Sequence, residues 1–310
     1  MSTHLNPLDQ LYLINHELMK HGDDFNFPIV TVGGQAVHYW VVWYLDNYET
    51  PPPGQYITSN DIDVTARRLD IQAIAKALDV PAEYNDGNPP SLAILPLTNA
   101  KNGSIKSYQN KLFVNKQIFD AENVERPNIV DILSSASDLE PKDFEGKKLL
   151  LHTEIFYLPL DGFQYTPHKN IRVLNPIACM ASRFHNVTTG VKKNIAQEVE
   201  RIKALMVPVV AYILEKFAET DFRVARKYYD LFIMNIEKSA YRRFIVTHNI
   251  SIIKMLDIIR SELIGSGKFN GSNKQFVLDE IPRTIKRIEE KLARKEAQIF
   301  REKMAIKHSH

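Results

Sequence analysis

Two aspartates, Asp61 and Asp63, are the residues of this chain whose type and spacing are best suited to chemistry. Side chains alternate between the two faces of a strand, so an apolar strand at residues 62–66 would direct both carboxylates the same way. Two such carboxylates repel each other unless a cation lies between them, and Mg²⁺ prefers oxygen ligands. The pattern therefore predicts a divalent-metal site, with Asp61 and Asp63 binding Mg²⁺ or Mn²⁺.

A pair of glycines, Gly33 and Gly34, precedes the aspartates. They lie between an apolar segment predicted as a strand at 27–32 and an aromatic segment predicted as a helix at 36–45. Glycine lets the backbone approach a bulky anion, and a helix N-terminus offers N–H groups to it. Each motif alone is typical of an ordinary turn or edge strand, but the two in this order indicate metal-dependent nucleotidyl transfer, with the glycines binding a nucleoside triphosphate. Ser59 is a candidate phosphate ligand or, equally, a turn-capping serine.

A third carboxylate, Asp131, lies alone in a β-branched apolar run at 128–134. A charge inside an apolar strand needs a partner. Two metal ions can stabilise the attacking and leaving oxygens of an in-line displacement, and a third carboxylate can bind one of them and orient or deprotonate the attacking hydroxyl. We therefore predict a catalytic, metal-binding set of Asp61, Asp63 and Asp131. Asp138 and Asp143 are rivals for the third position.

Composition indicates an ordinary globular protein, with 44% hydrophobic and 25% charged residues. The single cysteine, Cys179, excludes an intramolecular disulfide and a cysteine-based zinc site, and its apolar surroundings predict a buried thiol. No apolar stretch is long enough to span a bilayer, and the N-terminal residues are polar. We expect a cytoplasmic protein without a membrane partner.

Alternating helical and strand patterns up to about residue 174 predict an α/β (α+β) domain with a mixed sheet. At Asn175 and Pro176 the pattern becomes helical, and this pair suits the cap and first position of a helix. We therefore expect two domains, 1–175 and 176–310, the second a helical bundle. Its helices are predicted at 177–185, 195–216, 221–236, 251–264 and 281–307.

Charge is unevenly distributed. Residues 221–310 contain 19 basic and 11 acidic residues, a net charge of +8, and the remaining residues carry −6. This asymmetry suits a surface that binds a polyanion such as RNA, or simply a solvated face of long helices. The basic side chains recurring along the last helix are Arg283, Lys286, Arg287, Lys291, Arg294 and Lys295.

The glycine and aspartate motifs resemble those of the nucleotidyltransferase superfamily of the DNA polymerase β type, and more closely those of bacterial abortive-infection and toxin-type nucleotidyltransferases. The similarity covers roughly residues 27–200 and is carried by short motifs. They lie at residues 32–37, 58–63, 128–134, 173–176 and 181–187. One departure is the spacer between Gly34 and Asp61, whose 26 residues are more than in compact members of the superfamily.

The resemblance implies transfer of a nucleoside monophosphate from an NTP to an acceptor hydroxyl, with release of pyrophosphate. It implies a toxin or phage-defence role, a possible antitoxin partner, and an acceptor that is tRNA or another RNA, a protein or a small molecule. Arg183 matches a basic residue that faces the triphosphate in this superfamily, with a structural salt bridge as the alternative. Lys192 and Lys193 are weaker candidates for phosphate contact.

Two other functions stay open. The fold could serve as an inactive nucleotide- or RNA-binding module. Arg243 and His248 fit an R-x4-H spacing that resembles HEPN-type ribonucleases, a permissive pattern that also arises by chance. Arg67 and Arg68, which directly follow the carboxylate strand, could touch nucleic acid or form a solvated turn.

Overall fold

The structure is a computed structural model of the chain. It describes residues 4–59, 61–85, 87, 90–115, 126–136, 146–158, 165–190, 194–267, 269 and 272–308. The chain divides into two compact units, one of Met1–Leu45 with Pro51–Ser182 and one of Asp46–Thr50 with Arg183–His310. In the described part, no helix is long and apolar enough to cross a membrane.

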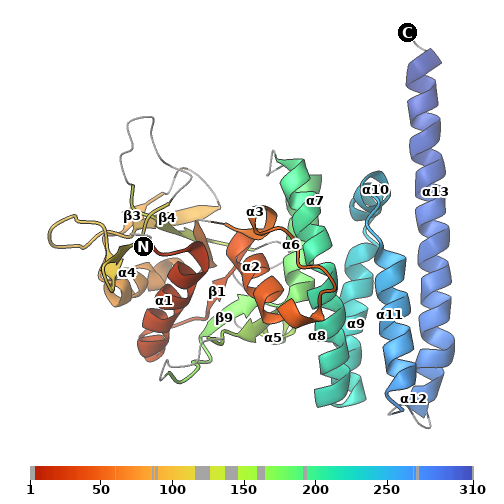
Figure 1. Cartoon of the computed structure of the whole chain (residues 1–310), viewed down its shortest axis with the longest axis horizontal. Helices are drawn as coiled ribbons and strands as arrows, with labels where there is room; N and C mark the ends of the chain where they lie inside the picture. The colour runs from red at the N-terminus through yellow and green to blue at the C-terminus, as the bar shows by residue number, and fades with distance from the viewer. Residues whose placement is uncertain are drawn as a thin grey trace. The chain divides into compact units, whose positions relative to one another are not determined.

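The first unit is built on a seven-stranded mixed sheet with the strand order β3-β4-β7-β2-β1-β9-β8 (Figure 1). Two neighbouring pairs, β1 with β9 and β2 with β7, are parallel, and the other pairs are antiparallel. A separate two-stranded hairpin is formed by β5 and β6. The strands are β1 (Ile29–Thr31), β2 (Ile62–Thr65), β3 (Glu83–Tyr84), β4 (Ser91–Pro96), β5 (Ser107–Tyr108), β6 (Lys111–Leu112), β7 (Ile129–Leu133), β8 (Thr153–Ile155) and β9 (Ile171–Leu174).

Helices of the first unit pack against this sheet and against one another. The helix α2 contacts β2, and α1 contacts both α2 and α4. The helices are α1 (Pro7–Lys20), α2 (Gly33–Trp43), α3 (Gly54–Ile57), α4 (Ile71–Leu78), α5 (Lys147–His152) and the start of α6 (Pro176–Thr188). Asn175 caps α6 as predicted, because its side-chain oxygen accepts a hydrogen bond from the Ala178 N–H at 2.9 Å.

The central strands have one apolar and one partly polar face. Ile62 and Val64 of β2 and Val130 and Ile132 of β7 are fully buried, whereas Asp63 and Asp131 are only half-buried. Alternation along a strand places these two sets on opposite faces. The apolar set forms the core, and the aspartates therefore lie on the other face of the sheet.

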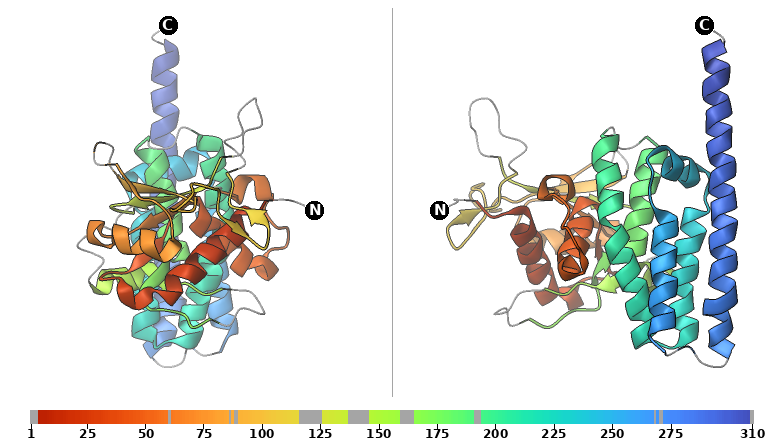
Figure 2. Two further views of the ribbon diagram at one scale, coloured as in Figure 1. Left: turned by 90° about the vertical axis from the view of Figure 1, so that its left-hand side faces the viewer. Right: turned by 45° about the vertical axis from the view of Figure 1, so that its right-hand side comes forward.

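The second unit is helical (Figure 2). Its last helix, α13, contacts α10 and α11. The helices are α7 (Ile195–Ala204), α8 (Met206–Glu219), α9 (Phe222–Ile236), α10 (Ser239–Thr247), α11 (Ile252–Gly265), α12 (Ser272–Gln275), the π-helical turn η6 (Phe276–Glu280) and α13 (Ile281–His308). The predicted fold class is thus confirmed at the level of a mixed α/β protein with a mixed sheet and a C-terminal helical region.

Three details differ from the sequence-based expectations. The helix predicted at 195–216 is two helices, because the chain turns at Leu205. Pro208 lies in the first turn of α8, where its missing N–H costs no interior helical hydrogen bond. The helix α10 was not predicted. The two units divide within α6, between Ser182 and Arg183, whereas the sequence placed the boundary at Asn175.

Candidate active site

Asp63 and Asp131 are paired positions on the neighbouring parallel strands β2 and β7. Paired residues of adjacent strands share a face of the sheet, so these carboxylates lie side by side on its half-exposed face. A β-bulge between Ser91 and Ala93 places Ser91 opposite Leu133. From there the Ser91 hydroxyl donates a hydrogen bond to Asp131 Oδ1 at 2.6 Å, which orients the Asp131 carboxylate.

Asp61 is held by a side chain that sequence reasoning missed. The amide of the buried Asn115 donates a hydrogen bond to Asp61 Oδ1. Asn115 follows Val114, whose carbonyl accepts a 3.1 Å hydrogen bond from the buried Gln10 Nε2 of α1. Asn128, which leads into β7, donates to Gln10 Oε1 at 2.7 Å. This network holds Asn115 in place and, through it, the carboxylate of Asp61. Because its members are far apart in the sequence, no local pattern could reveal it.

The first glycine of the motif packs directly against Asp63. Antiparallel pairing of β1 and β2 sets Val32 beside Asp63, and the Val32 N–H donates to the Asp63 carbonyl at 2.9 Å. Gly33 has a φ of +69°, and a Cβ atom there would overlap the Asp63 Oδ2 atom. Only glycine adopts this positive φ without strain and also lacks the Cβ that would overlap the Asp63 side chain. These two requirements together explain the glycine at position 33.

The same glycines begin α2, an 11-residue helix. Its cap residue, Val32, has no side-chain oxygen to accept from the first N–H groups. Gln35 in its first turn is buried and donates to the Ser59 carbonyl, which ties the segment before Asp61 to the helix. The helix N-terminus therefore lies against the Asp63 strand, where its N–H groups and dipole favour an anion.

The donor chemistry at this face suits a hard cation. Mg²⁺ is usually bound through one or two carboxylates together with substrate phosphates. Asp63 and Asp131 supply two adjacent carboxylates, and Asp61 a third within two residues of Asp63. Within the described ranges, no group of three or more His, Cys, Asp or Glu side chains is arranged to hold a metal ion. The register of β2 and β7 makes Asp63 and Asp131 the two carboxylates of the set that occupy paired positions.

Arg183 belongs to the second unit, where it forms a buried ion pair. Its Nη1 atom lies 3.4 Å from Glu198 Oε2, and Arg201 Nη1 lies 2.8 Å from Glu198 Oε1. All three side chains are less than a tenth exposed. One carboxylate between two guanidinium groups is the structural salt bridge that the sequence left open as the alternative to a triphosphate contact. In the first unit, Gly34 is the second residue of α2, and the Ser59 carbonyl accepts the hydrogen bond from Gln35 of the same helix.

Arg243 and His248 lie on and just after α10. The Arg243 Nη1 atom contacts Glu302 Oε2 of α13 at 2.9 Å. His248 packs on Phe244 with 4.3 Å between ring centroids, and burial, followed by the nearby Lys203 charge, lowers the pKa of His248. Arg243 therefore joins α10 to α13, whereas His248 packs on a side chain of the helix that it caps.

Carboxylates accompany four of the six basic residues that the sequence singled out on α13. Glu237 Oε1 lies 3.0 Å from Arg287 Nε and 2.8 Å from Lys291 Nζ. Arg283 is 3.7 Å from Asp279, and Arg294 is 3.6 Å from Glu290. The positive potential along this helix is therefore smaller than its count of basic residues indicates.

Four candidates from the sequence, Asp138, Asp143, Lys192 and Lys193, lie outside the described residues. No protein-family model, curated protein or solved structure matches this chain. The site is therefore interpreted from its own geometry.

Proposed function

We propose that this chain is a metal-dependent nucleotidyltransferase, which moves a nucleoside monophosphate from an NTP to an acceptor hydroxyl. The observation that carries the proposal is the paired placement of Asp63 and Asp131, with Gly33 of the α2 N-terminus packed against Asp63. Adjacent carboxylates suit a divalent cation, and the helix N-terminus beside them suits phosphate. Few other reactions need both features at one place.

In the proposed reaction the acceptor oxygen attacks the α-phosphorus of the NTP. A new phosphorus–oxygen bond forms, the bond between the α-phosphorus and the bridging oxygen breaks, and pyrophosphate leaves. The acceptor's proton passes to a carboxylate oxygen of Asp131, whose other oxygen is engaged by Ser91. Bound Mg²⁺ or Mn²⁺ would neutralise charge that develops on the phosphate oxygens.

The remaining residues orient these groups. The N–H groups at the start of α2 bind triphosphate oxygens. Gly33, which has no Cβ, lets the Asp63 side chain pack against this helix start. Asn115 holds the Asp61 carboxylate, and Gln35 holds the Ser59 backbone just before it. Pre-oriented groups of this kind lower the barrier because they need not reorganise during the reaction.

We propose an RNA acceptor, tRNA included, and a toxin or phage-defence role with an antitoxin partner. This part rests on the motif resemblance and on the +8 charge of residues 221–310. Ion pairs along α13 reduce its positive potential, and the labelling experiment identifies the acceptor.

The test is incubation of the protein with each α-labelled NTP, Mg²⁺ and total cell extract. We expect label on one class of macromolecule, no label with Asp63→Asn, and full labelling with the control Asp257→Asn, which changes an exposed aspartate of α11. NTP binding without label would indicate an inactive binding module. RNA cleavage without NTP, lost in His248→Ala, would instead assign a ribonuclease.

A further inference from the structure

A second surface of the first unit combines two arginines with two aromatic rings. An open cavity of about 740 Å³ is lined by Phe27, Arg67, Arg68, Leu69 and Tyr84. The Arg67 guanidinium lies over the Phe27 ring at 5.0 Å from its centroid, and that of Arg68 lies over Tyr84 at 5.4 Å. Leu69 is 59% and Tyr84 44% exposed, which is high for large apolar side chains.

This surface is held in place at several points. The buried Asp70 carboxylate accepts hydrogen bonds from the Asn26 N–H at 2.8 Å and the Phe27 N–H at 3.1 Å, which fixes the Phe27 backbone beside the Arg67–Asp70 segment. These N–H groups supply hydrogen bonds to both oxygens of the buried Asp70 carboxylate. Gln72 Nε2 donates to the Tyr84 hydroxyl at 2.9 Å, which orients the ring.

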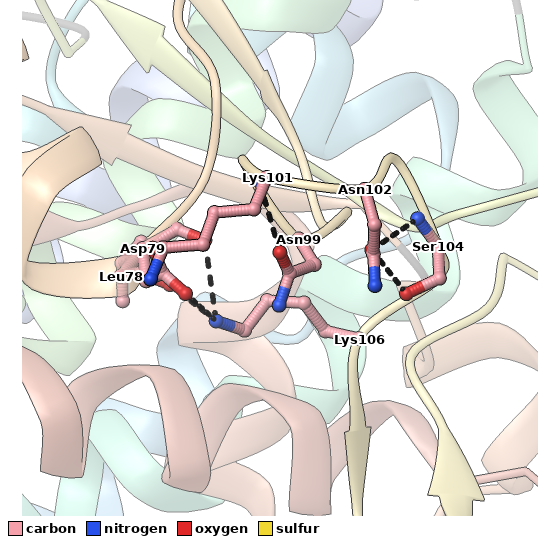
Figure 3. Close-up of polar contacts among 7 residues, drawn as sticks. All are labelled: Leu78, Asp79, Asn99, Lys101, Asn102, Ser104 and Lys106. Carbon is pink, nitrogen blue, oxygen red and sulfur yellow. Dashed lines mark hydrogen bonds and ion pairs between the residues drawn. The ribbon is translucent and has the colours of Figure 1, made fainter.

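The helix that follows, α4, is also fixed at its far end. Lys106 Nζ donates to the Leu78 carbonyl at 2.6 Å, and Lys106 lies within 4.0 Å of Asp79 Oδ2 (Figure 3). A cation at a helix C-terminus is favoured by the helix dipole. Arg68 and Leu69 directly precede the anchored Asp70, and the helix that follows is anchored at its C-terminal end, so their side chains form a preorganised surface.

We propose that this surface binds single-stranded nucleic acid. Two fixed guanidinium groups match phosphate, and the arginine and aromatic planes match the faces of bases. Strand alternation directs Glu83 away from the face of Tyr84, so the nearest acidic residue of β3 does not oppose a phosphate there. An acidic protein segment would form ion pairs with the arginines. It would leave the exposed parts of the Tyr84 and Leu69 side chains without an apolar or aromatic partner.

The surface is distinct from the carboxylate site. Arg67 follows Asp63 by four residues along an extended segment, a separation of about 13 Å at the rise of a strand. The proposal does not depend on nucleotidyl transfer, because a chain that binds a strand here and transfers nothing would still satisfy it.

The test is fluorescence anisotropy of a labelled ten-nucleotide adenosine RNA and of an abasic strand of the same length. We expect Tyr84→Ala to weaken binding of the RNA about tenfold and binding of the abasic strand much less, because the stacking ring is lost and both arginine charges remain. Tyr84→Phe keeps the ring and loses only the hydroxyl bond to Gln72, so it should bind the RNA more tightly than Tyr84→Ala. Arg68→Ala should weaken the binding of both strands. It should also reduce the magnitude of the slope of log K against log salt concentration by about 0.7.

The matched control is Arg223→Ala, which removes the same charge from an exposed position of α9 and should leave affinity unchanged. All variants retain α13, so any binding there is common to them. If Tyr84→Ala and Arg68→Ala both bound the RNA like Arg223→Ala, the proposal would be wrong. A labelled polyglutamate peptide that bound more tightly than the RNA and lost affinity in Arg68→Ala would instead assign the surface to an acidic protein.

Discussion

Asp63 and Asp131 lie side by side on one face of the sheet, at paired positions of the parallel strands β2 and β7. Like charges directly opposite in a sheet are destabilising, and both strands are otherwise apolar on their buried face. The pairing is therefore unfavourable by itself, and the cation that we propose to bind between the carboxylates would make it favourable. Metal binding would then add to the stability of the sheet.

A first prediction is that Mg²⁺ or Mn²⁺ stabilises the wild-type protein. Ligand at a hundred times its dissociation constant adds about 2.7 kcal/mol to the free energy of unfolding. Asp63→Asn and Asp131→Asn should each raise the melting temperature without metal. Asp63→Asn should abolish the metal-dependent increase, and Asp131→Asn should only reduce it. Differential scanning calorimetry with and without Mg²⁺ measures both effects. An equal metal-dependent increase in the wild type and in Asp63→Asn would place the cation elsewhere.

The role of Gly33 can be separated from ordinary backbone strain. Gly33 and Gly103 both have positive φ, +69° and +71°, but only at Gly33 would a Cβ meet another atom, in the Asp63 carboxylate. We expect Gly103→Ala to cost about 1 kcal/mol of stability and to leave transfer unchanged. Gly33→Ala should lower stability further and abolish transfer. Chemical denaturation measures stability, and a labelled-NTP assay measures transfer. Equal stability and equal transfer in Gly33→Ala and Gly103→Ala would contradict a role for the contact between Gly33 and Asp63.

Asn115 is predicted to act as a positioning residue for Asp61. Groups that orient metal ligands typically contribute 10- to 100-fold to metal affinity or activity. Asn115→Ala should therefore reduce transfer by about this factor and raise the Mg²⁺ concentration needed for half-maximal rate. The control, Asn102→Ala, removes an exposed amide that bonds within its own loop and should change neither. A purely structural role for Asn115 would lower stability but leave the Mg²⁺ dependence unchanged.

Glu198 should be essential to the stability of the second unit. Its carboxylate lies between the buried Arg183 and Arg201, so Glu198→Gln would remove a negative charge that pairs with both guanidinium groups. Removal of one member of a buried ion pair costs about 3–5 kcal/mol. The control, Glu200→Gln, removes the exposed pair with Lys203, worth about 0–1 kcal/mol. Equilibrium denaturation distinguishes them, and similar losses would show that the buried ion pairs contribute little.

Sequence reasoning reached the parts of this molecule that are encoded locally. The apolar alternation of β2 and the lone charge in β7 indicated both strands, and Asn175 with Pro176 indicated the start of α6. It could not give the register that pairs Asp63 with Asp131, because pairing depends on how distant strands align.

Contacts between distant residues were also out of reach. Asn115 lies 54 residues from Asp61, and nothing in its neighbourhood marks it as a partner of a carboxylate. Glu198 partners Arg183 from the next helix, a contact that only tertiary packing decides. Pro208 was a local indication of the break between α7 and α8 at Leu205. Apolar periodicity continues across the break, so the pattern predicted one helix.

The central claim is that Asp63 and Asp131 form one catalytic, metal-binding pair, and the most direct test measures NTP binding and transfer in both variants. We predict that Asp63→Asn weakens Mg²⁺-dependent NTP binding and lowers transfer by about 10³-fold or more. Asp131→Asn should retain NTP binding and lose turnover, because its role is on the acceptor side. Transfer near the wild-type rate in either variant, with Asp257→Asn as the reference, would contradict the account.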